Sequence, residues 1–97
     1  MLDTLTKEHW SIHIGETFAL EPENLAPLEL TLVEVTSFGR QRGLNREAYS
    51  LLFRGPMQPI QQQKIFTLSN SNMGKLDIFL VPLGPDAEGM RYEAVFT

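Results

Sequence analysis

Segments in which apolar and polar residues alternate, separated by turn-forming residues, recur through this 97-residue chain. The clearest one runs from Leu28 to Phe38 and begins with three leucines that alternate with polar residues. A period of two is typical of a half-buried strand. The parity then changes, because Val33 and Val35 become the apolar positions. One extra residue near Leu32–Val33, a β-bulge, would keep both halves of the strand facing the core. The alternative is a strand that is covered on both faces.

Six strands are expected in total, at residues 16–21, 28–38, 47–54, 61–68, 75–83 and 90–96, with a hairpin loop at 84–89. Turns every dozen or so residues leave no room for the helical crossovers that parallel strands need. The pattern therefore predicts a mainly β fold, an antiparallel six-strand small barrel or sandwich. The length fits a single domain, residues 1–97.

One short helix is expected at the N-terminus. Thr6 is a suitable N-cap, Glu8 falls in the first turn, and Gly15 is placed to stop the helix. Trp10 and Ile14 are four residues apart, so they are expected to share a face. The helix would plug an open end of the β structure or cover one sheet face.

The fifth strand is apolar on both sides in its second half. Leu76, Ile78 and Leu80 alternate towards one face, whereas Phe79, Val81 and Leu83 point to the other. Phe79 and Val81 need a cover, or else they form a surface for a partner. Phe79, Val81 and, on the third strand, Leu52 are the candidate protein interface.

Composition excludes several kinds of site. The chain has no cysteine, so a disulfide framework, a thiol nucleophile and a Cys-ligated metal are excluded, and a reducing compartment is favoured. The first residues show neither a basic region nor an apolar run, and no stretch is long enough to span a membrane. The net charge of −4 disfavours nucleic-acid binding. We expect a cytoplasmic protein with no membrane or nucleic-acid partner.

Two histidines are the first candidate ligands. His9 and His13 lie four residues apart on the expected helix, so both could reach one metal ion. The chain has no other His and no Cys to complete the site, and a carboxylate would have to supply the third ligand. Solvent-facing histidines are the favoured interpretation, and we expect no metal and no cofactor.

Three arginines surround the loop between the second and third strands. Arg40, Arg42 and Arg46 could together contact a phosphate or a carboxylate. The loop glycines do not match a phosphate-binding motif, and the segment does not open a helix. The alternative is a solvated loop without a ligand.

Four charged residues, Arg54, Asp77, Arg91 and Glu93, fall within expected strands. Cross-strand ion pairing is the favoured interpretation. The alternative is a barrel with a polar interior around Arg54 and Glu93, which would bind a small molecule. No paired acids in a cleft and no Ser-His-Asp arrangement are indicated, so we expect no catalytic activity.

Four segments and the opening residues together resemble a family of small stand-alone bacterial domains of unknown function, the DUF6916 group. The segments are 28–35 (LELTLVEV), 49–56 (YSLLFRGP), 76–85 (LDIFLVPLGP) and 89–96 (GMRYEAVF), with 1–6 (MLDTLT) at the start. The run Gln61–Lys64 departs from the pattern, where a more compact turn is expected.

The resemblance implies no activity, cofactor or catalytic residue. It does imply genes for phage-tail-collar-like proteins nearby, and hence a role in a tail-like assembly. The expected function is a non-catalytic structural or protein-interaction module. Its partner would be a protein, either a second copy or a neighbouring gene product.

Overall fold

The structure, a computed structural model, describes residues 5–20, 28–40, 47–57 and 62–96. Its elements in chain order are α1 (Lys7–Ser11), β1 (Thr17–Leu20), β2 (Leu28–Arg40), β3 (Glu47–Gly55), β4 (Lys64–Asn70), β5 (Gly74–Asp86) and β6 (Gly89–Phe96). The antiparallel, mainly β class with one short helix before the strands is thus confirmed for the described part of the chain.

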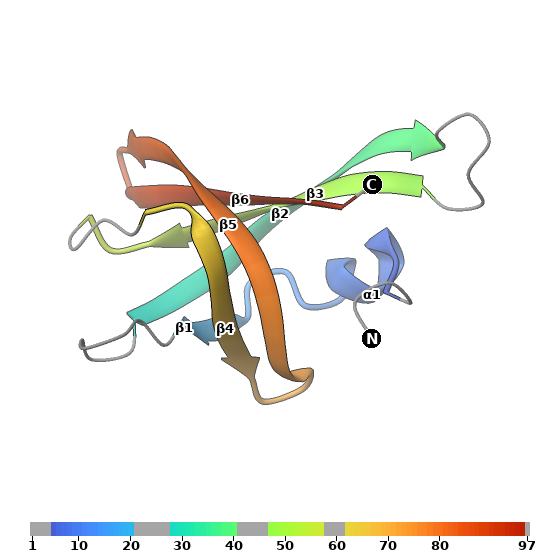
Figure 1. Ribbon diagram of the computed structural model, residues 1–97, viewed down its shortest axis with the longest axis horizontal. Helices are drawn as coiled ribbons and strands as arrows, with labels where there is room; N and C mark the ends of the chain where they lie inside the picture. Colours follow the sequence, from blue (N-terminus) through green and yellow to red (C-terminus); the bar gives the residue numbers. More distant parts are fainter. Residues whose placement is uncertain (1–4, 21–27, 41–46, 58–61, 97) are drawn as a thin grey trace.

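The six strands form a closed barrel in the order β1-β2-β3-β6-β5-β4 (Figure 1). Every neighbouring pair is antiparallel. A short pairing of β1 with β4, in which Ala19 lies opposite Ser69 and Leu20 opposite Leu68, closes the ring. Of the two architectures that the sequence left open, the structure is therefore the barrel.

The predicted bulge in β2 is confirmed. The register with β3 shifts between Leu32 and Glu34, so Val33 is the extra residue, and Leu32 is fully buried while Val35 packs against the core. A similar shift between Pro82 and Gly84 makes Leu83 an extra residue of β5. The strand continues past this bulge, and the expected end of the strand at residue 83 was wrong.

The helix begins as predicted and ends early. Thr6 is the N-cap, and its hydroxyl accepts a hydrogen bond from the His9 backbone, while the His9 ring accepts one from the Thr6 backbone. The helix ends at Ser11, because the next turn is closed by a tighter bond from His13 N to Trp10 O. Ile14 consequently does not share the face of Trp10 and is 46% exposed, which corrects the expectation.

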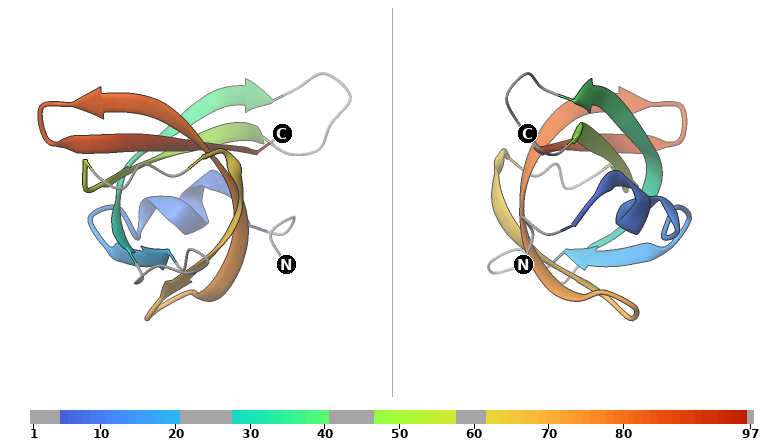
Figure 2. Two further views of the ribbon diagram at one scale, coloured as in Figure 1. Left: turned by 60° about the vertical axis from the view of Figure 1, so that its left-hand side comes forward. Right: turned by 90° about the vertical axis from the view of Figure 1, so that its right-hand side faces the viewer.

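The helix delivers one large side chain into the end of the barrel. Trp10 is fully buried, and its ring lies 6.1 Å from that of Phe18 and 6.0 Å from that of Phe96. Figure 2 shows α1 within the outline of the strands, across one opening. The helix therefore plugs the barrel end, and it does so without covering the outer side of β5.

Candidate functional site

Apolar side chains meet on the outer side of four adjacent strands. The register places Ile65 of β4 opposite Phe79 of β5. Val81 lies opposite Glu93, and Glu93 in turn lies opposite Leu52 of β3. The sequence neighbours of these residues, which include Phe66, Leu80 and Leu51, point into the core. We call Leu52, Ile65, Phe79, Val81 and Val95 the outer stripe.

Val95 joins the stripe through the antiparallel register of β5 and β6. Val81 of β5 lies opposite Glu93 of β6. Phe79 lies two residues before Val81, and Val95 lies two residues after Glu93. Because the two strands are antiparallel, both steps lead in the same direction. Side chains two residues apart on a strand share a face. Phe79 and Val95 therefore lie on neighbouring strands of the outer face, next to the row Leu52–Glu93–Val81.

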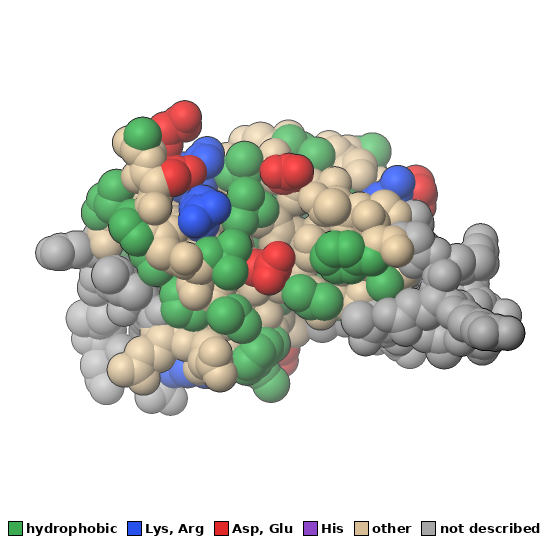
Figure 3. Space-filling view, turned by 90° about the horizontal axis from the view of Figure 1, so that it is seen from above, with side chains coloured by type: hydrophobic (Ala, Val, Ile, Leu, Met, Phe, Trp, Pro, Cys, Tyr) green, Lys and Arg blue, Asp and Glu red, His purple; other side chains and the backbone are tan. Residues whose placement is uncertain are grey.

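The stripe is open to solvent. Ile65 is 65% exposed, Phe79 50% and Val95 53%, whereas Leu52 and Val81 are half-buried. The view from above shows apolar side chains across the middle of this side of the molecule, with separate acidic side chains among them (Figure 3). Large apolar side chains that are grouped on one face mark interaction sites more often than scattered exposed residues do.

The four strand charges do not pair with one another as expected. The register places Arg54 opposite Arg91, so that two like charges face each other, and it places Glu93 between two apolar residues. Asp77 instead accepts a hydrogen bond from the Thr67 hydroxyl at 2.8 Å. Arg91 donates to the Gly84 carbonyl at 3.3 Å. The expected ion pairs among these four residues were wrong, because the β3–β6 register places Arg54 opposite Arg91 and Glu93 opposite Leu52, and Asp77 lies opposite Thr67.

Arg54 forms its ion pair with the β5–β6 turn. Its Nη2 lies 2.6 Å from Asp86 Oδ2, and its Nη1 lies 3.6 Å from Glu88 Oε2. Asp86 also accepts hydrogen bonds from the backbone N–H groups of Glu88 and Gly89. The hydrogen bond from Arg54 and those from the turn lower the pKa of Asp86 to about 2. The positive charge of the Arg54 guanidinium is thus balanced by the carboxylates of Asp86 and Glu88.

The alternative of a polar interior around Arg54 and Glu93 finds no support. Their neighbours Phe53, Tyr92 and Ala94 are the buried residues that face the core. Arg54 borders a hollow of about 400 Å³ on the outside of the barrel, lined also by Glu29, Thr31, Val33, Gly55, Pro56 and Glu88.

The Asp86 ion pair makes stability dependent on acid pH. The folded-state pKa lies below the ordinary value of 3.8, so the stabilisation is complete above that value and is lost as the pH falls through about 2. Asp86→Asn should therefore lower stability near neutral pH and flatten the pH dependence between about 4 and 2. Urea unfolding followed by circular dichroism across this range measures both effects. Arg54→Met, and the double variant that combines it with Asp86→Asn, should show the same flattened pH dependence of stability. If they do not, the Arg54–Asp86 ion pair is not the source of the pH dependence.

The loop arginines are only partly described. Arg40 ends β2, and its backbone lies opposite Glu47, but its side chain is not among the described ones. Arg42 and Arg46 lie outside the described residues. The anion contact remains a prediction.

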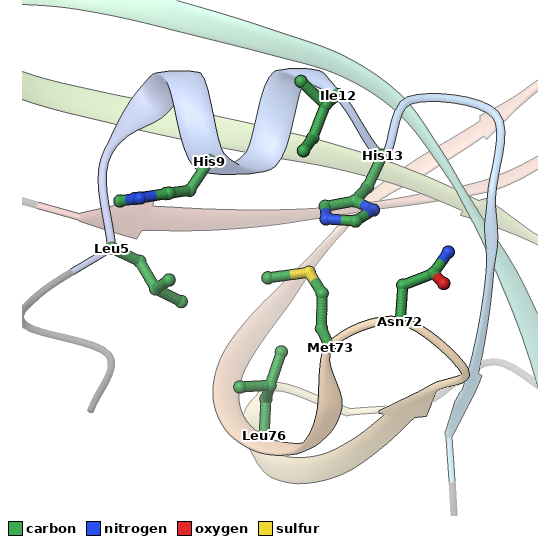
Figure 4. A pocket seen from close by; sticks show the side chains of 7 residues that line it. All are labelled: Leu5, His9, Ile12, His13, Asn72, Met73 and Leu76. Carbon is green, nitrogen blue, oxygen red and sulfur yellow. The ribbon is translucent and has the colours of Figure 1, made fainter.

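The histidines face a small hollow between α1 and the β4–β5 turn. It has a volume of about 230 Å³ and an apolar lining that includes Leu5, Met73 and Leu76 (Figure 4). The His9 ring is engaged by the helix cap, and His13 Nδ1 lies 3.0 Å from Glu16 Oε2. The described residues contain no group of three or more ligands that could hold a metal ion.

Two features of this region were missed in the sequence. The Glu16 carboxylate accepts hydrogen bonds from the side chains of Asn72 and Asn70 and contacts the His13 ring. The contact with Asn72 first, and then those with His13 and Asn70, lower the pKa of Glu16. This long-range contact has no sequence signal. Ile65, by contrast, could have been assigned to the outer stripe, because it precedes the inward Phe66 and Leu68 in an alternating pattern.

No helix in the described part of the chain is both long and apolar enough to cross a membrane.

Comparisons with known proteins identify one relationship. No curated protein and no solved structure matches the chain significantly. The family model described as "Domain of unknown function (DUF6916)" matches residues 5–96, which is nearly the whole chain. The chain therefore belongs to the DUF6916 family.

Proposed function

We propose that this chain is a protein-interaction module without catalytic activity, and that the outer stripe is its contact surface. The observation that carries the proposal is the directly opposed pair Ile65 and Phe79, of which each is at least half exposed. Large apolar side chains that stay in water on a rigid barrel lower the free energy of association when a partner covers them.

The stripe has the composition and the support that binding surfaces need. Phe79 is an aromatic residue flanked by branched aliphatic ones, and aromatic residues are enriched at interfaces. The inward neighbours of Phe79 on β5, Ile78 and Leu80, are almost fully buried, so the strand is fixed by the core. A surface that is already ordered loses little conformational entropy on binding.

The family resemblance suggests the setting. We propose that the module acts in the cytoplasm and accompanies a phage-tail-like assembly, in which another component covers the stripe. The products of neighbouring genes are therefore the first proteins to test as partners, and a second copy of the chain is the alternative occupant.

Phe79→Thr should weaken binding of the partner roughly 30-fold or more, as expected for an aromatic residue at the centre of an interface. Threonine keeps the high strand propensity, so the fold should survive. Biolayer interferometry with purified neighbouring gene products, together with light scattering for self-association, measures the effect.

The chain offers a matched control for this substitution. Phe38 of β2 is 58% exposed but is not part of the stripe. Phe38→Thr should change binding by no more than about threefold, the range of peripheral contacts. Equal losses in the two variants, with unchanged thermal unfolding, would argue that the stripe is not the contact surface.

A further inference from the structure

Three carboxylate side chains in the described part of the chain are partly buried, and only two of them have partners. Glu16 is held by Asn70 and Asn72. Asp86 is held by Arg54 and by the backbone of its turn. Glu93, the third, is half-buried, and its carboxylate has neither a hydrogen bond nor an ion pair within the described residues.

The surroundings of Glu93 make its lack of a partner costly. Its two cross-strand neighbours, Leu52 and Val81, are apolar, and Val95 follows it on the same face. The nearest cation on its strand, Arg91, donates to the Gly84 carbonyl. A carboxylate that is partly removed from water by apolar neighbours gains from a fixed opposite charge.

Two exposed acidic residues next to the stripe favour the same kind of ligand. Glu34 lies opposite Leu52 on the side away from Glu93, and Asp77 lies two residues before Phe79. Both are exposed acids, and each accepts only a neutral hydroxyl, from Thr36 and Thr67 respectively. The chain as a whole carries a net charge of −4. An acidic surface of this kind attracts a basic partner and orients it.

We propose that Glu93 receives a cationic side chain of the partner protein, an arginine or lysine flanked by apolar residues that pack on the outer stripe. This inference rests on the proposed function, and it adds the chemistry that selects the partner. When the partner covers the stripe, water is excluded from the ion pair. The ion pair in turn fixes where the partner sits along the stripe, which apolar contacts alone would not do.

Titration of the ¹⁵N-labelled chain with benzylguanidinium tests the inference, because this probe carries an apolar ring and a cation. Benzyl alcohol and benzoate are the neutral and anionic comparisons. Benzylguanidinium should bind most tightly and should shift the amide signals of Leu52, Val81 and Glu93. Glu93→Gln should weaken its binding roughly two- to fivefold, the range of partly exposed ion pairs.

Glu29→Gln is the matched control, because it makes the same change in net charge at an exposed β2 position outside the stripe. It should leave the titration unchanged. Glu93→Gln should also keep or raise the thermal unfolding midpoint, since it removes a half-buried charge without breaking a contact. A fall in the midpoint would indicate a structural role for Glu93 and would overturn the inference.

The remaining outcomes separate the two proposals. If all three probes shift the stripe amides equally and Glu93→Gln has no effect, the stripe accepts apolar ligands but selects no cation. The inference then fails while the proposed function stands. If no probe shifts these amides at all, the stripe is not a binding surface and both fail.

Discussion

Replacing Trp10 by alanine should lower the free energy of unfolding by about 3 to 5 kcal/mol, the range for removing a buried tryptophan. The side chain is fully buried at the end of the barrel, where it packs on Phe18 and Phe96. Its Nε1 donates a hydrogen bond of 2.9 Å to the Tyr49 hydroxyl. Domains of this size are stable by only about 5–15 kcal/mol, so the loss is a large fraction of the total.

Urea unfolding followed by far-ultraviolet circular dichroism measures this effect, because Trp10 is the one tryptophan of the chain and its fluorescence is lost with it. Trp10→Phe is the control. It keeps a ring in the core and removes the N–H donor, while the Tyr49 hydroxyl still donates to the Leu5 carbonyl. We expect this variant to lose about 1 to 2 kcal/mol. Equal losses in both variants would show that the ring does not plug the barrel.

Gly89→Ala should lower the free energy of unfolding by about 3 kcal/mol, through overpacking and backbone strain together. Gly89 begins β6 with a φ of 152°, a backbone conformation that residues with a side chain rarely adopt. A Cβ atom at this position would clash with the carbonyl oxygen of Gly55 and would lie 3.2 Å from Arg54 Cγ. The substitution therefore disturbs both the β3–β6 contact and the turn that Asp86 holds.

Gly74 provides the comparison. Its φ is 81°, but nothing lies within 4 Å of an added Cβ atom. Gly74→Ala should therefore show only the backbone cost, about 1 kcal/mol. Thermal and urea unfolding of the two variants separate strain from clash. A Gly89→Ala variant no less stable than Gly74→Ala would mean that β6 moves away from Gly55 easily.

Local sequence patterns predicted the strands well, because each strand of the barrel has one buried face. The change of parity at Val33 predicted a bulge that the register confirms. The Thr6 cap followed from side-chain chemistry in the same way. Such features depend on residues close together in the chain, so their signals are present in a short window.

Contacts between distant residues could not be predicted in this way. The choice of barrel over sandwich depends on the pairing of β1 with β4, about fifty residues apart. The Arg54–Asp86 ion pair depends on a bulge at Leu83 that alternation does not reveal, since Gly84 and Pro85 resemble a loop. Each of these features is fixed by register, which a single strand does not encode.

The candidate site was predicted in part. The two-sided apolar pattern of β5 identified Phe79 and Val81 as outer residues, and the structure leaves Phe79 half exposed. The position of Ile65 and Val95 beside these two residues could not be predicted, because it depends on the strand order β3-β6-β5-β4. The unpartnered state of Glu93 became visible only when its neighbours across the sheet were known.

Site-specific photocrosslinking in cells that express the neighbouring genes tests the central claim most directly. The photoreactive residue p-benzoylphenylalanine is placed at Phe79 in one variant and at Phe38 in another, since both side chains are about equally exposed. The account predicts an adduct with one defined protein, or with a second copy of the chain, from position 79 and little or none from position 38. No adduct at position 79, or equal adducts at both positions, would contradict it.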